Sequence, residues 1–213
     1  MEVKNKVIII IGADHPAGYA LMHLLNGENT FIYAYGASLS FDFKRKTNIT
    51  YHSFSPEHIT FLQENIQEIY NIHGHIDTVF CIIPDSVPEI NVTDLTPELL
   101  QQAMLKTTYC AWKSTLYAVP YLKNATHGSV IFITSNSHRH ISPDNSLSSL
   151  CSASIESITK NFASEVAAFG IRICSVAADI RATPDQIASC AMFLASEQAS
   201  YITGTMIEVS PLL

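Results

Sequence analysis

Seven short, almost continuously apolar runs recur along the chain, and they constrain its fold more than any other feature of the sequence. They occupy residues 7–11, 30–35, 49–53, 78–83, 129–134, 171–176 and 206–209, with segments of helical periodicity between them. Apolar runs without polar alternation are typical of strands that are covered on both faces. The sequence therefore predicts an α/β fold, a doubly wound three-layer sandwich around a mostly parallel seven-stranded sheet, with ligands at the carboxyl ends of the strands.

Helix starts between these runs carry clear signals. Ser55, Thr96 and Thr183 each stand before a proline and an acidic residue. Gln186 completes a capping box with Thr183. The chain has 213 residues without a linker, repeat or low-complexity segment, so we expect one domain over residues 1–213.

Composition excludes several classes of protein. The net charge is −7 and basic residues cluster only at Lys44 to Lys46, which argues against a nucleic-acid partner. Five cysteines, an odd number without a C-x-x-C pair, predict reduced thiols and neither disulfides nor a metal site. The longest aliphatic run is too short to cross a bilayer or to form a secretory signal, so we expect a cytoplasmic protein without membrane contact.

The first run leads into a glycine-bearing loop from Gly12 to Gly18 and then into an apolar-periodic helix. Such a loop lets the backbone approach a pyrophosphate, whose charge the helix N-terminus stabilises. Gly12, Asp14, His15 and Gly18 are therefore candidate dinucleotide contacts. Because Pro16 removes one backbone donor from the loop, the alternative is a tight turn in a fold that no longer binds nucleotide.

Five further stretches, in order along the chain, resemble the short-chain dehydrogenase/reductase family, and the loop is similar to the family's T-G-x-x-x-G-x-G. They read GHIDTV at 74–79, GSVIFITS at 128–135, SAS at 152–154, AFGIRI at 168–173, and LAS with ASYITG between 194 and 204. The resemblance covers essentially the whole chain. It implies a Rossmann fold and NAD(P)-dependent oxidoreductase chemistry on a carbonyl or alcohol substrate.

The same resemblance identifies catalytic residues that are missing. It implies a tyrosine as general acid/base, a lysine four residues later that lowers the pKa of that tyrosine, a serine that bonds the substrate oxygen and an asparagine that holds a water relay. Cys151 stands at the tyrosine position and Ile155 at the lysine position. Lys106 or Thr107 takes the asparagine position, and Ser135 alone is retained.

Other side chains near Ser135 could replace the missing pair. Cys151 could carry a proton, although its thiol would need a neighbouring cation to ionise. Lys106 could act as a displaced cation, and His138 or His140 could serve as a general base. The alternative for each of them is a structural or solvated side chain.

The connection after the sixth run is short. Relatives carry Pro-Gly and a long excursion over the substrate there, whereas Ala178 and Asp179 are followed within a few residues by Thr183 and the next helix. We therefore expect the substrate lid to be deleted, which leaves few walls for a small substrate. Thr183 could contact the nicotinamide amide or only cap the helix.

Cofactor choice is weakly marked in the sequence. Residues 33–38 offer neither an acid for an adenosine ribose nor an arginine for a 2′-phosphate, and Ser53 replaces the acid that relatives carry beside the adenine. Lys44, Arg45 and Lys46 favour NADP slightly. We expect NADP or NAD to bind weakly.

These observations predict a degenerate family member, a pseudoenzyme or nucleotide-responsive binding protein with at most weak NAD(P) binding. The alternative is an NAD(P)H-dependent oxidoreductase with a non-standard acid/base around Ser135. Hydrophobic residues make up 47% of the chain and charged residues 15%, which indicates apolar surface buried between subunits. By the resemblance, we expect a homodimer or homotetramer through the helices near 97–122 and 149–169.

Overall fold

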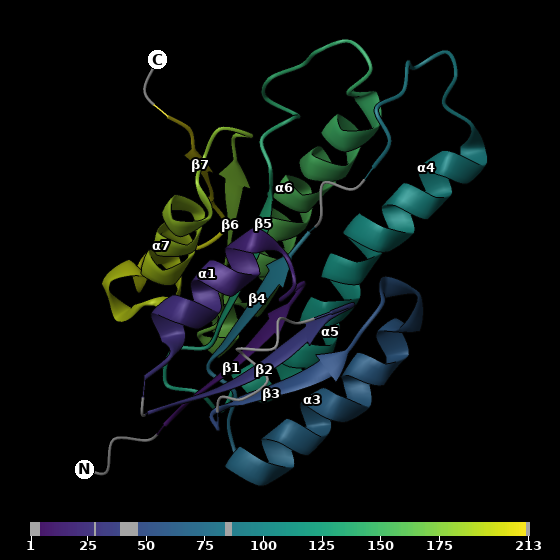
Figure 1. Cartoon of the computed structure of the whole chain (residues 1–213). Helices are drawn as coiled ribbons and strands as arrows, with labels where there is room; N and C mark the ends of the chain where they lie inside the picture. The colour runs from purple at the N-terminus through teal and green to yellow at the C-terminus, as the bar shows by residue number, and fades with distance from the viewer. Residues whose placement is uncertain (1–4, 28, 39–46, 84–86, 212–213) are drawn as a thin grey trace.

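The seven apolar runs form the strands of one sheet in the computed structural model, which describes residues 5–27, 29–38, 47–83 and 87–211 (Figure 1). The strands are β1 (Lys6–Ile11), β2 (Thr30–Gly36), β3 (Ile49–Ser53), β4 (Thr78–Ile82), β5 (Ser129–Ser135), β6 (Arg172–Ala178) and β7 (Met206–Val209). Their order is β3-β2-β1-β4-β5-β6-β7, and each of these neighbouring pairs is parallel. The predicted fold class is confirmed.

Helices cover both faces of this sheet, since each crossover between parallel strands returns the chain along one face. They are α1 (Pro16–Leu25), α3 (Ile59–His73), α4 (Pro97–Met104), α5 (Cys110–Leu122), α6 (Ser146–Val166) and α7 (Pro184–Ala195). α1 and α7 lie on one face, and α3 to α6 lie on the other (Figure 1). Among the described residues, no helix combines the length and apolar character that crossing a membrane requires.

The strand β1 shows how the two cores are filled. Ile9 and Ile11 pack against the α3 to α6 layer, whereas Ile8 and Ile10 pack against α1 and α7. Successive side chains of a strand point to opposite faces, so a strand between two helix layers must be apolar at every position.

Two of the predicted helix starts are confirmed. Thr96 accepts a hydrogen bond from the Leu99 amide at 3.3 Å, and Thr183 forms the capping box with Gln186. Gly74 ends α3 in the left-handed conformation, with φ of 75°. These signals depend on contacts within a few residues, so the sequence alone specifies them.

The predicted start at Ser55 is confirmed in its position, with Pro56 and Glu57 in the first turn, but not in its capping bond. Its hydroxyl donates to the Glu57 carboxylate and makes no bond to the helix backbone. A 3-10 turn at Pro56–His58 comes first, and α3 begins at Ile59. A charged acceptor two residues away competes with the backbone for this hydroxyl.

A buried arginine ties the C-terminal part of the chain to the sheet. Arg172, at the start of β6, is 6% exposed. Its guanidinium donates to the carbonyl oxygens of Leu194 at 2.6 Å, Ser196 at 3.3 Å and Ile202 at 3.4 Å. These carbonyls belong to the end of α7 and to the segment before β7, so one side chain anchors both.

We expect Arg172→Met to lower the free energy of unfolding by about 2 kcal/mol, because methionine occupies similar space but leaves buried carbonyls without a donor. Urea unfolding followed by circular dichroism measures the change. Lys160→Met removes an exposed lysine from α6 and serves as the control, with little expected effect. Equal stability of Arg172→Met and the wild type would contradict the anchoring role.

Candidate functional site

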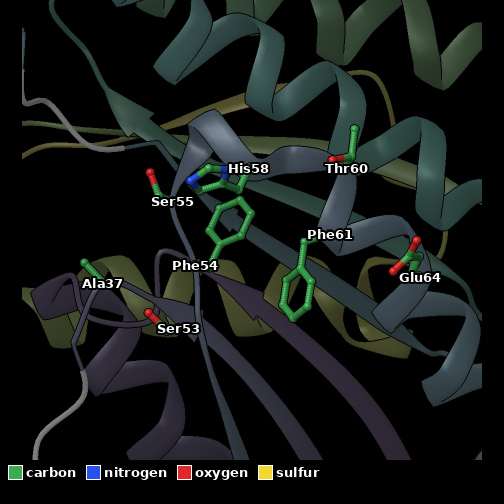
Figure 2. A pocket seen from close by; sticks show the side chains of 8 residues that line it. All are labelled: Ala37, Ser53, Phe54, Ser55, His58, Thr60, Phe61 and Glu64. Carbon is green, nitrogen blue, oxygen red and sulfur yellow. The ribbon is translucent and has the colours of Figure 1, made fainter.

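Three neighbouring cavities lie along the carboxyl edge of the sheet, and together we call them the edge groove. The first, of about 660 Å³, lies between the ends of β2 and β3 and the start of α3 (Figure 2). The second, about 350 Å³, and the third, about 270 Å³, run past the end of β1 to the ends of β5 and β6. The first two share Ala37 and Phe54, and the last two share His15, Pro16 and Ile82.

The loop after β1 packs tightly against its neighbours at the middle of the edge groove. Gly12 has φ of +78°, and a Cβ on it would lie 2.7 Å from the Ile82 carbonyl oxygen. A Cβ on Gly18, in the first turn of α1, would lie 2.6 Å from the Ala13 carbonyl oxygen. Both positions therefore require glycine, one against β4 and one for the approach of α1 to the loop.

Several donors of this loop already have partners within the chain. The amides of Gly12 and Ala13 donate to the Tyr35 carbonyl at 2.8 and 2.9 Å. The Nδ1 atom of His15 accepts from the Ala17 amide at 3.2 Å and so caps α1. A pyrophosphate would compete with His15 for the N-terminus of this helix.

Asp14 connects the loop to the end of β2. Its Oδ2 accepts from the Ala37 amide at 2.9 Å and from the Ser38 amide at 3.3 Å. In Rossmann folds the adenosine ribose lies at the end of the second strand. Asp14 therefore sets a carboxylate at the end of the second strand, although it comes from the first loop. A search for an acid on residues 33–38 misses it.

Aromatic rings line the first cavity. Figure 2 shows the rings of Phe54, His58 and Phe61 along it, with Ser53 at the end of β3. Flat apolar walls of this kind suit a nucleobase, which offers a π face to stack on. The basic residues Lys44, Arg45 and Lys46 lie outside the described residues.

Ser135 ends β5 and lines the third cavity. Ala178 and Asp179, at the end of β6, line the same cavity. The Ser135 hydroxyl lies 2.7 Å from Ser137 Oγ and 3.4 Å from Ser148 Oγ. A hydroxyl in this place can donate to a ligand oxygen and accept from the hydroxyls behind it.

A chain of hydrogen bonds leads from this serine to the surface of α6. Ser137 Oγ lies 3.2 Å from Ser152 Oγ, which lies 3.0 Å from His138 Nδ1. His138 Nε2 lies 2.9 Å from Glu156 Oε2. The sequence marks His138 as a candidate base but gives it no partner. Ser152 and Glu156 are four residues apart, so they lie on one face of a helix. This spacing is the sequence signal from which the two partners of His138 could be predicted.

The positions of the missing catalytic pair are packed. Cys151 is 4% exposed and belongs to a small apolar cluster with Ala103 and Leu147. The space between Cys151 and Ser135 holds about 10 Å³, far less than a phenol ring needs. Ile155 is fully buried between α6 and the sheet. Neither position has room for the side chain that the resemblance implies.

Lys106 faces the edge groove, whereas Thr107 faces the small space beside Ser135 and Cys151. They lie in a π-helical turn, Leu105–Tyr109, that joins α4 to α5. Lys106 lines the second cavity, and its Nζ lies 3.6 Å from Glu57 Oε1. Thr107 is buried beside Ser135. The structure does not bring Lys106 to Ser135, because the wider turn directs it toward Glu57.

Residues 179–183 connect β6 to α7 without a helix of their own. The Thr183 hydroxyl accepts from the Gln186 amide at 3.3 Å, and the Thr183 amide donates to Gln186 Oε1 at 2.9 Å. Thr183 therefore serves the helix cap. Ile180, which is 98% exposed, and Ala182 line the third cavity. The connection forms one wall of the cavity and has no room for a helical lid.

All five cysteines are unpaired with one another in the structure. Cys190 is partly exposed, and the other four are buried. Within the described part of the chain, no three histidine, cysteine, aspartate or glutamate side chains gather in a way that could hold a metal ion.

A parallel sheet in this order, with a glycine-bearing loop after β1, defines a Rossmann-type fold. A family model described as enoyl-(acyl carrier protein) reductase matches residues 56–184, more than half of the chain. The chain therefore belongs to the short-chain dehydrogenase/reductase family. Among curated proteins, none matches it significantly.

Solved structures share the fold at low sequence identity. The Cj0485 dehydrogenase has a TM-score of 0.88 at 17% identity, over 97% of this chain and 93% of its own. A short-chain type dehydrogenase/reductase from Mycobacterium ulcerans has a TM-score of 0.89 at 15% identity, over 98% and 90%. A mutant short-chain dehydrogenase/reductase from Serratia marcescens has a TM-score of 0.85 at 16% identity, over 98% and 97%.

Restoring the family's lysine should destabilise this protein. Ile155→Lys places a charge without a partner in the core, which we expect to lower the free energy of unfolding by about 3–5 kcal/mol. Ile155→Met, of similar length without the charge, should lower it by less than about 1.5 kcal/mol. Urea unfolding measures both variants. A stable Ile155→Lys protein would show that the packing around this position is not as described.

Proposed function

We propose that the chain binds a nicotinamide dinucleotide in the edge groove, with the adenosine in the first two cavities and the nicotinamide in the third. The observation that carries this proposal is the row of neighbouring cavities, linked by shared lining residues, that extends from Phe54 past Gly12 to Ser135. The groove crosses the point where the strand order reverses beside β1, which is where open α/β sheets bind ligands. Membership of an oxidoreductase family favours a redox dinucleotide as this ligand.

In this proposal the protein acts by binding, as a nucleotide-responsive member of the family that lacks the usual hydride-transfer residues. Cys151 and Ile155 are packed where the tyrosine and lysine would stand. Binding is weak, because the loop amides and the N-terminus of α1 already have partners. The short connection after β6 removes a further source of binding energy, since a lid would add contacts over the ligand.

The described residues favour NAD over NADP. Asp14 holds its carboxylate at the ribose position, and the Ala37 and Ser38 amides that could bind a 2′-phosphate donate to it. A carboxylate accepts a hydrogen bond from a ribose hydroxyl and repels a phosphate. This differs from the slight preference for NADP that residues 44–46 suggest in the sequence.

NADH should bind roughly tenfold more tightly than NADPH, and Asp14→Ser should remove most of this preference by removing the repulsion. Titration of each dinucleotide, followed by nicotinamide fluorescence, measures both affinities. Asp94→Ser removes an exposed acid from the loop before α4 and is the charge-matched control, with unchanged affinities expected. Tighter binding of NADPH by the wild type would refute the role of Asp14, and binding of neither dinucleotide at millimolar concentration would refute the proposed function.

One observation favours a second function, an NADH-dependent oxidoreductase that acts on a carbonyl or alcohol. Hydrogen bonds join the Ser135 hydroxyl, through other hydroxyls, to His138 and Glu156. A substrate oxygen beside Ser135 would then have a source of protons that does not depend on a tyrosine.

We also propose a homodimer or homotetramer through the layer of α4, α5 and α6. Tyr109, Trp112 and Leu116 are exposed on this layer. A cavity of about 410 Å³ lies between Trp112 and Ile158 of α6. An exposed apolar area of this kind favours contact with another subunit.

Light scattering at micromolar concentration should report a dimer or a tetramer for the wild type. Trp112→Glu combined with Leu116→Glu should yield a monomer, because charges at the centre of an apolar interface are costly to bury. Leu24→Glu places a charge on an exposed leucine of α1, on the opposite face, and should leave the assembly intact. A monomeric wild type would refute the proposed assembly.

A further inference from the structure

We propose that the hydroxyl chain behind Ser135 is a proton relay, and that His138 with Glu156 supplies the acid and base that a tyrosine and lysine supply in relatives. The inference rests on the second proposed function, an NADH-dependent oxidoreductase that binds its dinucleotide in the edge groove, and it names the acid and base of that function. Ser135 Oγ lies 2.7 Å from Ser137 Oγ, which lies 3.2 Å from Ser152 Oγ. Ser152 Oγ lies 3.0 Å from His138 Nδ1, which completes the path.

Glu156 fixes the direction of the relay. Bonds from Lys160 and His138 lower the pKa of the Glu156 carboxyl, so the group is charged at neutral pH and only accepts. His138 Nε2, at 2.9 Å, therefore carries a proton, and Nδ1 is the acceptor of the neutral ring. The Ser152 hydroxyl has three possible acceptors, which are His138 Nδ1 at 3.0 Å, Ser137 Oγ at 3.2 Å and the Ser149 carbonyl at 3.3 Å. The bond to Nδ1 is the shortest of the three, so we assign the Ser152 proton to it.

Charged groups around His138 support this assignment. They are Glu156 and Lys160 of α6 and Arg139 of the same loop. Arg139 Nε lies 3.3 Å from His138 Nε2, which cannot accept from Arg139 and donate to Glu156 at once. The bond to the carboxylate is shorter and charge-assisted, so it decides the tautomer. Lys160 Nζ and Arg139 Nη2 bond the other carboxylate oxygen, at 2.8 and 3.5 Å.

Burial decides which chemistry this arrangement performs. Ser152, His138 and Glu156 are the side-chain types of a hydrolase triad, joined by the corresponding hydrogen bonds. Ser152 is 1% exposed, and its oxygen also accepts the His138 amide at 3.1 Å, so it cannot attack a substrate carbonyl. Ser135, in the wall of the third cavity, is the hydroxyl that meets a ligand. The arrangement therefore transfers protons and forms no acyl-enzyme.

Reduction of a carbonyl compound needs one hydride and one proton, and the relay supplies the proton. When bound, the reduced dinucleotide supplies a hydride to the carbonyl carbon. The carbonyl oxygen takes the proton of Ser135, each hydroxyl takes the proton of the next, and the His138 imidazolium gives up its Nδ1 proton. The products are the alcohol, the oxidised dinucleotide and a neutral His138, which regains one proton from solvent. Alcohol oxidation uses the same bonds in reverse.

Substitution of His138 tests the relay. His138→Gln keeps the backbone bond to Ser152 but carries no titrating proton. NADH-dependent reduction of a panel of aldehydes and ketones should fall roughly a hundredfold in His138→Gln and in Ser135→Ala, with NADH affinity unchanged within about twofold. The pH dependence of the wild-type rate should differ from that of His138→Gln, because glutamine cannot exchange a proton with solvent as the imidazole does.

His140→Gln is the matched control. His140 Nε2 bonds Glu208 Oε1 at 2.8 Å, so it forms a histidine–glutamate pair in the same loop that is separate from the relay. The His140→Gln variant should keep the wild-type rate and pH profile. An unchanged rate and profile in His138→Gln would overturn the relay, as would a wild type that binds NADH and turns over no substrate. Failure to bind NADH would instead overturn the proposed function.

Nitrogen NMR of the histidines gives a readout that needs neither substrate nor variant. At a pH where the ring is neutral, His138 should carry its proton on Nε2, with Nδ1 as the acceptor. A proton on Nδ1 would leave the Ser152 hydroxyl without that acceptor and would contradict the relay, whether or not the variants fold.

Discussion

Parallel pairing of β1 with β2 on one side and with β4 on the other is the constraint on which the site depends. It brings the carboxyl ends of the strands to one edge and sends the following helices to opposite faces. The loop that holds Gly12 and Asp14 is far in the sequence from Ser135 and from Asp179, and all three regions meet at this edge for that reason. The strand order therefore determines where the edge groove lies, and individual side chains only determine what lines it.

The strands and two of the caps could be predicted because their causes are local. A strand between two helix layers must be apolar throughout, and the sequence displays this directly. Thr96 and Thr183 need partners within three residues. The capping rule fails at Ser55, because the Ser55 hydroxyl bonds the charged Glu57 carboxylate and not the helix backbone. Family resemblance located Ser135, because a serine at the end of β5 lies in a stretch whose pattern is retained.

The contacts of the candidate site were harder to predict, because they join residues that no local pattern connects. Asp14 reaches the amides after β2, although the usual pattern places an acid on β2 itself. His138 has the sequence context of a surface loop, and its partners Ser152 and Glu156 come from α6 once the loop folds back on that helix. Lys106 is the converse case, since one π-helical turn directs it away from the serine.

The short connection from β6 to α7 has a kinetic consequence. In relatives with lids, release of a ligand waits for a segment to open. Residues 179–183 form a wall of the third cavity without a helix of their own. Under the proposed binding mode, a dinucleotide would therefore leave this cavity without waiting for residues 179–183 to open. The bound fraction would then equilibrate quickly with the surrounding pool of oxidised and reduced dinucleotide, and this connection would trap neither form.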